Sequence, residues 1–243
     1  MNDSKVFWSA QTSSLNQSSD LEFYRRKANE HAALMTPEER DAGCIDLGCG
    51  AGEMLMFLTD HLRVKVGLDF SESMLAAARE ALAGRDIELT SADAFAYLPM
   101  ARIAVWTTTG AMNQYLPAQD LQRLVGIFAS NPAAQSFFLF DCIDPLRYHL
   151  MPLGISYRPA YAERRQSPNL RQRAAQLYFR ARYSACLSLG VLDKDVLSLA
   201  NSAMGYAVAP HFWHRIGSAF GLDVQMVSSR YYEYRYHAIL RKK

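Results

Sequence analysis

The 243-residue sequence has few cysteines: there are four, with no Cys-x-x-Cys pair and no histidine at zinc-finger spacing. This scarcity argues against a disulfide-stapled fold and a structural zinc site, and we expect no bound metal. Long hydrophobic runs are also missing, because the longest uncharged stretch, 196–214, is interrupted by Asn201, Gly205 and Pro210. The first ten residues lack the basic and apolar segments of a secretory signal. We therefore expect a cytoplasmic protein without a membrane span.

Acidic side chains become scarce in the second part of the chain. Residues 1–146 carry 11 basic and 19 acidic side chains, whereas residues 147–243 carry 15 basic and 5 acidic ones. Between 147 and 182 stand eight arginines, no lysine, and Glu163 as the only acid. Such an excess of arginine is typical of a surface that meets an anion, because guanidinium binds phosphate or carboxylate with two parallel hydrogen bonds. The same composition also suits a solvated helix that only aids solubility.

Short apolar runs alternate with amphipathic segments from residue 44 onward, a pattern typical of a parallel sheet with helices on both faces. The expected helices lie at 21–35, 53–58, 71–82, 121–128 and 211–220. The expected strands lie at 44–47, 64–69, 87–90, 103–107, 137–140, 222–227 and 231–240. A Ser228-Ser229 turn joins the last two strands, so they should be antiparallel. The fold class is therefore α/β, with a Rossmann-like, seven-stranded, mostly parallel sheet and an antiparallel last strand.

The alternation stops between residues 144 and 209. Prolines indicate irregular structure at the start of this segment, and residues 169–189 and 193–203 are predicted to be helical. We interpret 144–209 as a helical insert over the carboxyl edge of the sheet. The length suits a single domain over 1–243. Its predicted parts are an N-terminal arm and helix (1–40), a core (41–143), the insert (144–209) and a terminal helix with antiparallel strands (210–243).

The glycine-rich segment 48–52 directly follows an expected strand and directly precedes an expected helix. Its three glycines permit a tight turn and let a ligand approach the backbone closely. Asp69, at the tip of the second strand, can accept hydrogen bonds from both hydroxyls of a ribose, and Asp93, past the third strand, can accept from the amine of an adenine. The loop has the form G-x-G-x-G rather than G-x-G-x-x-G, so NAD is the less favoured of the adenosine-containing cofactors.

Three segments in this order resemble the class I S-adenosylmethionine-dependent methyltransferases. They are Ile45–Glu53, Gly67–Leu75 and Ala92–Phe95, with weaker similarity at Thr108–Asn113 and Phe138–Asp141. The resemblance spans 43–143 and 210–240. The sequence departs from the family at Asn131–Ala134, where a Lys-Pro-Gly-Gly turn is common, and at Arg102, where an acid is usual. These departures affect the assignment to a subfamily rather than the cofactor loop.

The resemblance implies S-adenosylmethionine as cofactor, S-adenosylhomocysteine as product, and 41–143 as the cofactor-binding core. It places the methionine portion on Asp46 and the backbone of Gly48, Cys49, Gly50 and Gly52, and the ribose on Asp69. The other implied cofactor residues are Phe70, Met74, Asp93, Ala94 and Phe95 around the adenine, Thr107 and Thr108 near the sulfonium, and Tyr24 over the carboxylate.

An oxygen or protonated nitrogen acceptor must lose a proton, so a base is expected. The catalytic candidates are His149, His211 and His214. The substrate-contact candidates are Asn113, Arg147, Tyr231 and Tyr232. The alternation of 231–237 predicts a tyrosine ladder on one face of the last strand, and His31 is expected to be a partly exposed helix residue rather than a ligand.

We expect an enzyme that transfers a methyl group to an oxygen or nitrogen of a small-molecule or glycan-linked acceptor. The arginine-rich segment favours an anionic acceptor, and the polar arm 9–20 and the insert would close over it. A second hypothesis is an RNA methyltransferase that uses the basic insert, although no known RNA-binding module is evident. The sequence is also compatible with a protein that binds S-adenosylmethionine without turnover, with an NAD-binding domain, and with a degenerate domain that binds neither cofactor.

Overall fold

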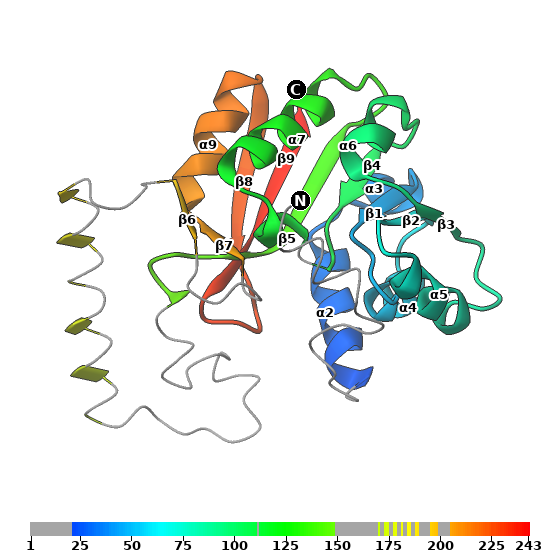
Figure 1. The fold of residues 1–243 in the computed structure, drawn as a ribbon, viewed down its shortest axis with the longest axis horizontal. Coiled ribbons are helices and arrows are strands. Elements are labelled where there is room, and N and C mark those ends of the chain that lie inside the picture. Colours follow the sequence, from blue (N-terminus) through cyan, green and yellow to red (C-terminus); the bar gives the residue numbers. More distant parts are fainter. Residues whose placement is uncertain are drawn as a thin grey trace.

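A computed structural model describes residues 21–110, 112–148, 195–198 and 205–243, with isolated positions between 170 and 189. Its centre is a seven-stranded sheet in the order β3-β2-β1-β4-β5-β9-β8 (Figure 1). The strands are β1 (Cys44–Leu47), β2 (Val64–Asp69), β3 (Glu88–Ser91), β4 (Val105–Thr107), β5 (Ser136–Ile143), β8 (Leu222–Ser228) and β9 (Arg235–Lys242). Neighbouring strands are parallel except at β9, which is antiparallel to β5 and β8. The predicted fold class is confirmed.

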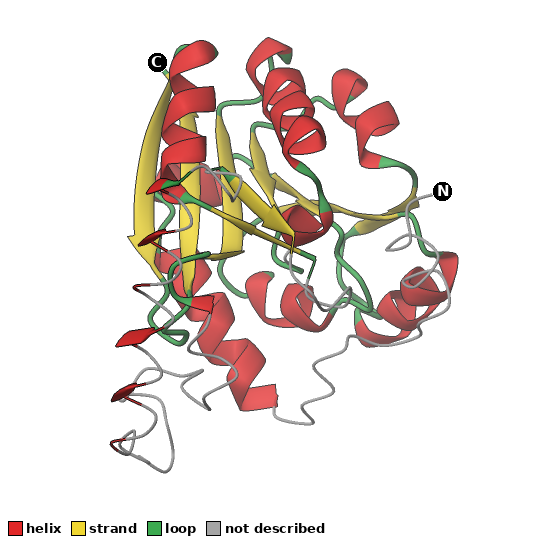
Figure 2. Cartoon of the chain, turned by 60° about the vertical axis from the view of Figure 1, so that its left-hand side comes forward, coloured by secondary structure: helices red, strands yellow, loops and turns green. Residues whose placement is uncertain are grey.

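Helices cover both faces of the sheet (Figure 2). The helices are α2 (Leu21–Ala33), α3 (Pro37–Asp41), α4 (Glu53–Leu58), α5 (Glu72–Ala81), α6 (Ala94–Tyr97), α7 (Ala118–Ser130) and α9 (Pro210–Ala219), with 3₁₀ turns η1 (Leu98–Met100) and η2 (Met112–Tyr115). One face packs against α6, α7 and α9, and the other against α2, α4 and α5. Alternate residues of β5 enter the two cores, Phe137 and Leu139 on one side and Phe138 and Phe140 on the other. This explains the continuous apolar run of that strand.

The predicted helix at 193–203 is wrong. Val196–Ser198 forms strand β6, which pairs antiparallel with β7 (Tyr206–Val208). The Val196 side chain is buried in the core with Val208, so packing against the segment that returns beside it outweighs the local helical spacing. Most of the predicted insert and the whole arm 9–20 lie outside the described residues, although the described positions from 170 to 188 are helical as predicted.

Thr36 caps α3, because its hydroxyl accepts the amide hydrogen of Glu39 while the Glu39 carboxylate accepts that of Thr36. One further expectation is corrected near the C-terminus. The last strand begins at Arg235 rather than at Tyr231, and residues 229–234 form the turn from β8. The predicted tyrosine ladder therefore does not form. No helix among the described residues is long and apolar enough to cross a membrane.

His31 is fully buried rather than partly exposed. It lies on the face of α2 that carries Ala28 and Ala32, which packs on the sheet, and its ring stacks on Phe140 with centroids 3.7 Å apart. Spacing of three and four residues put His31 on the apolar face, so the sequence contained this signal.

Candidate cofactor and acceptor site

The glycine loop connects β1 to α4 at the carboxyl edge of the sheet. Gly48, Gly50 and Gly52 all have positive φ, at 70°, 57° and 82°, a conformation that favours glycine. The amides of Gly48 and Cys49 donate to the carbonyl of Leu68 at 2.7 and 3.1 Å, which binds the loop to β2. Burial raises the pKa of the Cys49 thiol well above its ordinary value, so this side chain serves as packing rather than as a nucleophile.

Asp69 ends β2 directly beside this loop. Its Oδ2 accepts the Gly50 amide at 3.0 Å, and its Oδ1 accepts the Ser71 amide at 2.9 Å. Burial raises the pKa of Asp69, and these two amides oppose that effect because they stabilise the charged form. Each carboxylate oxygen has a second lone pair, so the fixed carboxylate retains the capacity to accept a hydroxyl. A Cβ added at Gly50 would meet no atom within 4 Å, so there is free space beside the Gly50 backbone.

Asp46 connects β1 to the end of β4 and is fully buried. It accepts hydrogen bonds from the Thr107 hydroxyl at 2.9 Å, the Thr109 amide at 2.8 Å and the Thr109 hydroxyl at 2.5 Å. Burial raises the pKa of Asp46 to about 6, against the effect of these donors. The loop that follows β4 directly contacts the glycine loop, because a Cβ at Gly110 would stand 2.3 Å from the carbonyl oxygen of Gly48. Thr109 was not among the predicted site residues, although three consecutive threonines at a strand end were a signal.

Thr108 and Asn113 form a second buried connection, from β4 to β5. The Thr108 hydroxyl donates to the Asn113 Oδ1 at 3.1 Å and accepts the Phe140 amide at 3.2 Å. The Asn113 Nδ2 donates to the Cys142 Sγ at 3.1 Å, and the Asn113 side chain is fully buried. In this arrangement Asn113, a predicted substrate contact, connects the end of β4 to β5 through its hydrogen bonds.

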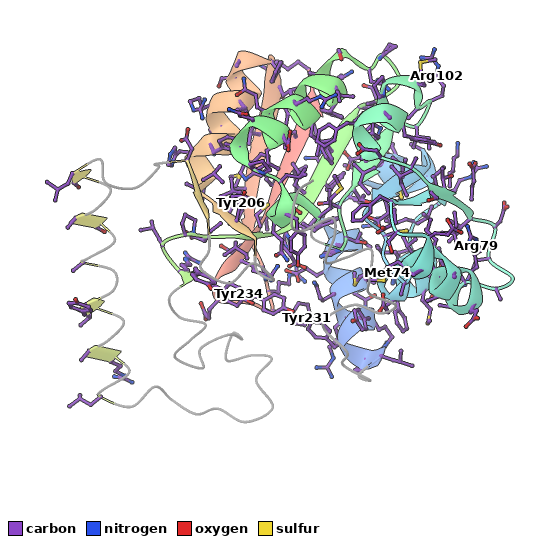
Figure 3. All side chains as sticks on the ribbon, in the orientation of Figure 1. Met74, Arg79, Arg102, Tyr206, Tyr231 and Tyr234 are labelled. Carbon is purple, nitrogen blue, oxygen red and sulfur yellow. The ribbon has the colours of Figure 1, made fainter. Side chains whose placement is uncertain are left out.

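The residues predicted around the adenine follow β2 and β3. Phe70 is 38% exposed, whereas Met74, in the first turn of α5 (Figure 3), is buried. Asp93 caps α6, because its Oδ1 accepts the Phe95 amide at 2.9 Å, and Ala94 is buried beneath that turn. Both segments lie at the carboxyl edge, on the β2–β3 side of the glycine loop.

Comparisons with known proteins agree with this geometry. Residues 44–130 match the family model described as "Methyltransferase domain". This part of the chain, which holds the glycine loop, Asp69 and Asp93, is therefore similar to a methyltransferase domain. Among curated protein sequences, none matches this chain.

Solved structures share this fold over nearly the whole chain. Streptomyces venezuelae DesVI is 16% identical, with a TM-score of 0.56 over 99% of this chain and 97% of that one. Magnesium protoporphyrin IX methyltransferase (ChlM) from Synechocystis PCC 6803, with bound S-adenosylhomocysteine, is 14% identical, with a TM-score of 0.54 over 100% and 95%. A methyltransferase from Archaeoglobus fulgidus is 12% identical, with a TM-score of 0.58 over 92% and 95%. At these identities the likeness establishes the fold.

A separate group of mainly aromatic side chains lies around Ile143, the last residue of β5. We call it the tyrosine cluster; its buried members are Ile143, Ala207, Tyr231, Tyr232 and Tyr234. Phe23 of α2 packs on it, with ring centroids 6.5 Å from Tyr231 and 6.2 Å from Tyr232 (Figure 3). Tyr24 points instead into the core between α2 and α4, which also contains Cys49 of the glycine loop. The glycine loop, Asp69 and Asp93 thus lie at the carboxyl edge of the sheet, whereas the predicted substrate contacts Tyr231 and Tyr232 are largely covered.

The predicted catalytic histidines are not brought together with the glycine loop. His149 lies outside the described residues. His211 and His214 are exposed on α9, which packs on β8 and β9, and the Nε2 of His211 lies 2.8 Å from the Asp195 Oδ1. In the sheet, the three strands β4, β5 and β9 lie between β8, on which α9 packs, and β1, which leads into the glycine loop. Arg147 is exposed at the start of the segment that follows β5.

Proposed function

We propose that this protein is an S-adenosylmethionine-dependent methyltransferase that acts on an oxygen or nitrogen atom of an anionic, small-molecule or glycan-linked acceptor, bound at the carboxyl edge beside the cofactor. The observation that carries the proposal is the joint placement of the Gly50 amide and the Asp69 carboxylate, 3.0 Å apart at the tips of β1 and β2. A backbone without a Cβ beside a fixed carboxylate suits a ribose that carries a bulky, charged substituent.

The residues present fit S-adenosylmethionine. Asp69 would accept the ribose hydroxyls, the glycine loop would face the methionine portion, and Phe70 with Asp93 would border the adenine. When bound, the cofactor supplies an electrophilic methyl group on a positively charged sulfur. Asp46 acts from behind the site, because its bonds to Thr107 and Thr109 fix the β4 end against the glycine loop.

The chain's task is then mainly alignment and exclusion of water. Holding two reactants in line can supply roughly 7–11 kcal/mol of barrier lowering. A positioned base adds about 10²–10⁴-fold for an acceptor that must lose a proton. The described candidate histidines, His211 and His214, lie on α9 away from the glycine loop, so neither is proposed as that base.

The positions of the two ends of the arginine-rich segment 144–209 support an anionic acceptor. Residue 144 directly follows β5, whose next-to-last residue, Cys142, pairs with Tyr236. The Tyr236 hydroxyl donates to the Val208 carbonyl at 2.6 Å, so the chain returns near the same strand end before α9 begins. Both ends of 144–209 are therefore anchored at the carboxyl edge. Its eight arginines between 147 and 182 would suit phosphate or carboxylate.

Acceptors named for proteins of similar fold differ widely. They include mitomycin, magnesium protoporphyrin IX and small RNA. The fold therefore does not select among them, and the arginine content is what favours an anion. An RNA acceptor is the second candidate, favoured by the same arginines. It predicts affinity for unrelated RNA sequences that falls steeply with salt.

The first test is calorimetric titration of the full chain with S-adenosylmethionine, S-adenosylhomocysteine and NAD. We expect binding of the first two only. Asp69→Ala should weaken binding by roughly 10- to 100-fold, the effect of losing charge-assisted hydrogen bonds to two hydroxyls. Asp86→Ala, at an exposed turn before β3, is the matched control and should bind normally. Unchanged affinity in Asp69→Ala would contradict the ribose assignment.

The second test is a screen of phosphorylated and carboxylated sugars and metabolites, with formation of S-adenosylhomocysteine as the signal. Turnover with anionic acceptors and not with their neutral analogues supports the proposal. Equal turnover with both contradicts the anionic class. Cofactor binding without turnover on any acceptor, RNA included, would favour a non-catalytic S-adenosylmethionine-binding protein.

A further inference from the structure

Five polar or charged side chains are buried between α2 and the adjoining parts of β5 and β9. We call them the polar cluster: Lys27, Glu30, His31, Asp141 and His237, each at most 7% exposed. Charged side chains are rarely buried to this extent unless they are paired. None of these five residues takes part in the cofactor assignment above.

Two connections in the cluster attach α2 to the sheet. The Lys27 ammonium forms an ion pair with the Asp141 Oδ2, across 114 residues of sequence. The Glu30 Oε1 lies 3.2 Å from the Nε2 of His237 and also accepts the amide hydrogen of Arg230. Because these two residues of α2 are one turn apart, the helix is held at two adjacent points.

Asp141 has an unusual backbone. Among the described residues it is the only non-glycine with positive φ, at 56°. The pairing of β5 with β9 shifts between Leu139 and Cys142, so Phe140 and Asp141 face His237 across a β-bulge. The Asp141 amide donates to the His237 Nδ1 at 3.2 Å. A strained bulge that aims a carboxylate under a helix is a feature that a purely packing role does not require.

The composition of two histidines and an aspartate would also suit a divalent metal, since their ligand atoms lie within 4.8 Å of one another. The contacts argue against this. The Lys27 ammonium already neutralises Asp141. The Nδ1 of His237 accepts the Asp141 amide, so its proton is on Nε2, which then donates to Glu30 and has no lone pair for a metal. The cluster is better described as one internal ion pair, Lys27 with Asp141, beside a hydrogen bond between His237 and Glu30.

The same residues hold the tyrosine cluster. The Lys27 ammonium lies 5.5 Å from the ring centroid of Tyr232 and 5.7 Å from that of Phe23. The Asp141 carbonyl accepts from Arg235 at 2.9 Å, and Arg235 lies 5.2 Å over Tyr232. Burial alone would raise the pKa of Asp141, but Lys27 and Arg235 outweigh it and hold that pKa below its ordinary value. Asp141 therefore contacts both cations, Lys27 through its carboxylate and Arg235 through its backbone carbonyl.

We propose that Lys27 and Asp141 are positioning residues for the methyl transfer. Their ion pair sets the position of α2, whose Tyr24 and Ala28 pack in one core with Cys49 of the glycine loop and Met54 of α4. It also sets the position of the tyrosine cluster on the acceptor side. The pair thus acts on the cofactor through α2 rather than by touching it. This proposal rests on the proposed function.

The test compares S-adenosylhomocysteine affinity, by calorimetry on the full chain, with the melting temperature. Lys27→Met leaves Asp141 buried without its partner, and we expect affinity to fall by about tenfold, within the range of coupled sites. Arg26→Met is the matched control on the exposed side of α2, where Arg26 contacts Glu22 at 2.7 Å. It should bind like the wild type. A lower melting temperature in Lys27→Met with unchanged affinity would overturn the proposal.

The double variant Lys27→Met/Asp141→Asn keeps the proposal testable if a single variant does not fold, because it leaves neither charge unpaired. If the two residues act as one pair, its affinity should be about tenfold below wild type rather than the hundredfold of independent effects. Wild-type affinity in the double variant would overturn the proposal. If the wild type itself binds no S-adenosylhomocysteine, the proposed function fails and this proposal fails with it; if only the variants are unaffected, the positioning role alone is refuted.

Discussion

Asp46→Asn tests whether a buried carboxylate reduces the stability of the fold at neutral pH. Asn has nearly the same shape as Asp and can accept from Thr107 and from the Thr109 amide through its oxygen. Its amide nitrogen would face the Thr109 hydroxyl, which can rotate to accept. The substitution therefore removes the charge and preserves most of the contacts.

The magnitude follows from the pKa of Asp46, which burial raises from 3.8 to about 6. A raised carboxyl pKa means that the folded protein binds the proton more tightly than the unfolded chain. The stabilising contribution is then complete below pH 3.8 and is lost as the pH rises through about 6. At 1.36 kcal/mol per pKa unit the total loss is about 3 kcal/mol, of which about 2.4 falls between pH 4 and 7.5.

The assay is urea unfolding of the wild type and Asp46→Asn at several pH values from 4 to 7.5. The difference between the two cancels the other titrating groups, and we expect the free energy of unfolding of Asp46→Asn to gain about 2.4 kcal/mol on that of the wild type over this range. Thr109→Val removes one hydroxyl donor to the carboxylate and should move the wild-type transition to higher pH. A difference that does not change with pH would refute the reasoning, because Asp46 would then titrate alike in both states.

Three further predictions test local geometry. Gly50→Ala and Gly84→Ala each place a Cβ at positive φ in open space, so both should lower the free energy of unfolding by about 1 kcal/mol. Only Gly50→Ala should also weaken S-adenosylhomocysteine binding. Equal losses of binding in the two variants would contradict the site. Asp141→Gly should be more stable than Asp141→Ala by about 1 kcal/mol, because φ there is 56°, and the opposite order would exclude the bulge. Tyr236→Phe should cost about 2 kcal/mol of unfolding free energy, because the buried indole N–H of Trp213, 2.8 Å from the phenol oxygen, loses its acceptor; an unchanged midpoint would contradict that bond.

The sequence predicted the cofactor half of the molecule well because its determinants are local. Glycines 48, 50 and 52 stand between a strand and a helix, and each is needed for positive φ. Asp69 ends the next strand, and its contact with Gly50 follows from the parallel pairing of β1 and β2. In such a sheet, carboxyl ends of neighbouring strands must meet, so sequence spacing is enough to bring the residues together.

The other half escaped prediction where its determinants are non-local. Val196–Ser198 is a strand only because residues 206–208 return beside it. Tyrosines 231, 232 and 234 belong to a turn, because Arg235 is the first residue held in register by β5. The predicted alternation treated a turn as a strand, and nothing in the local pattern distinguishes the two.

The polar cluster explains why the acceptor side could not be predicted from a motif. Lys27 and Asp141 are 114 residues apart, and neither stands in a pattern that indicates a partner. Their meeting requires the bulge at residue 141, which no local residue preference dictates, since glycine would adopt that backbone at lower cost. Here the side chain at the bulge is the buried anion that joins α2 to the sheet. Because α2 also packs in one core with Cys49 of the glycine loop, we expect that cofactor binding depends on this contact between distant segments as well as on the contiguous glycine motif.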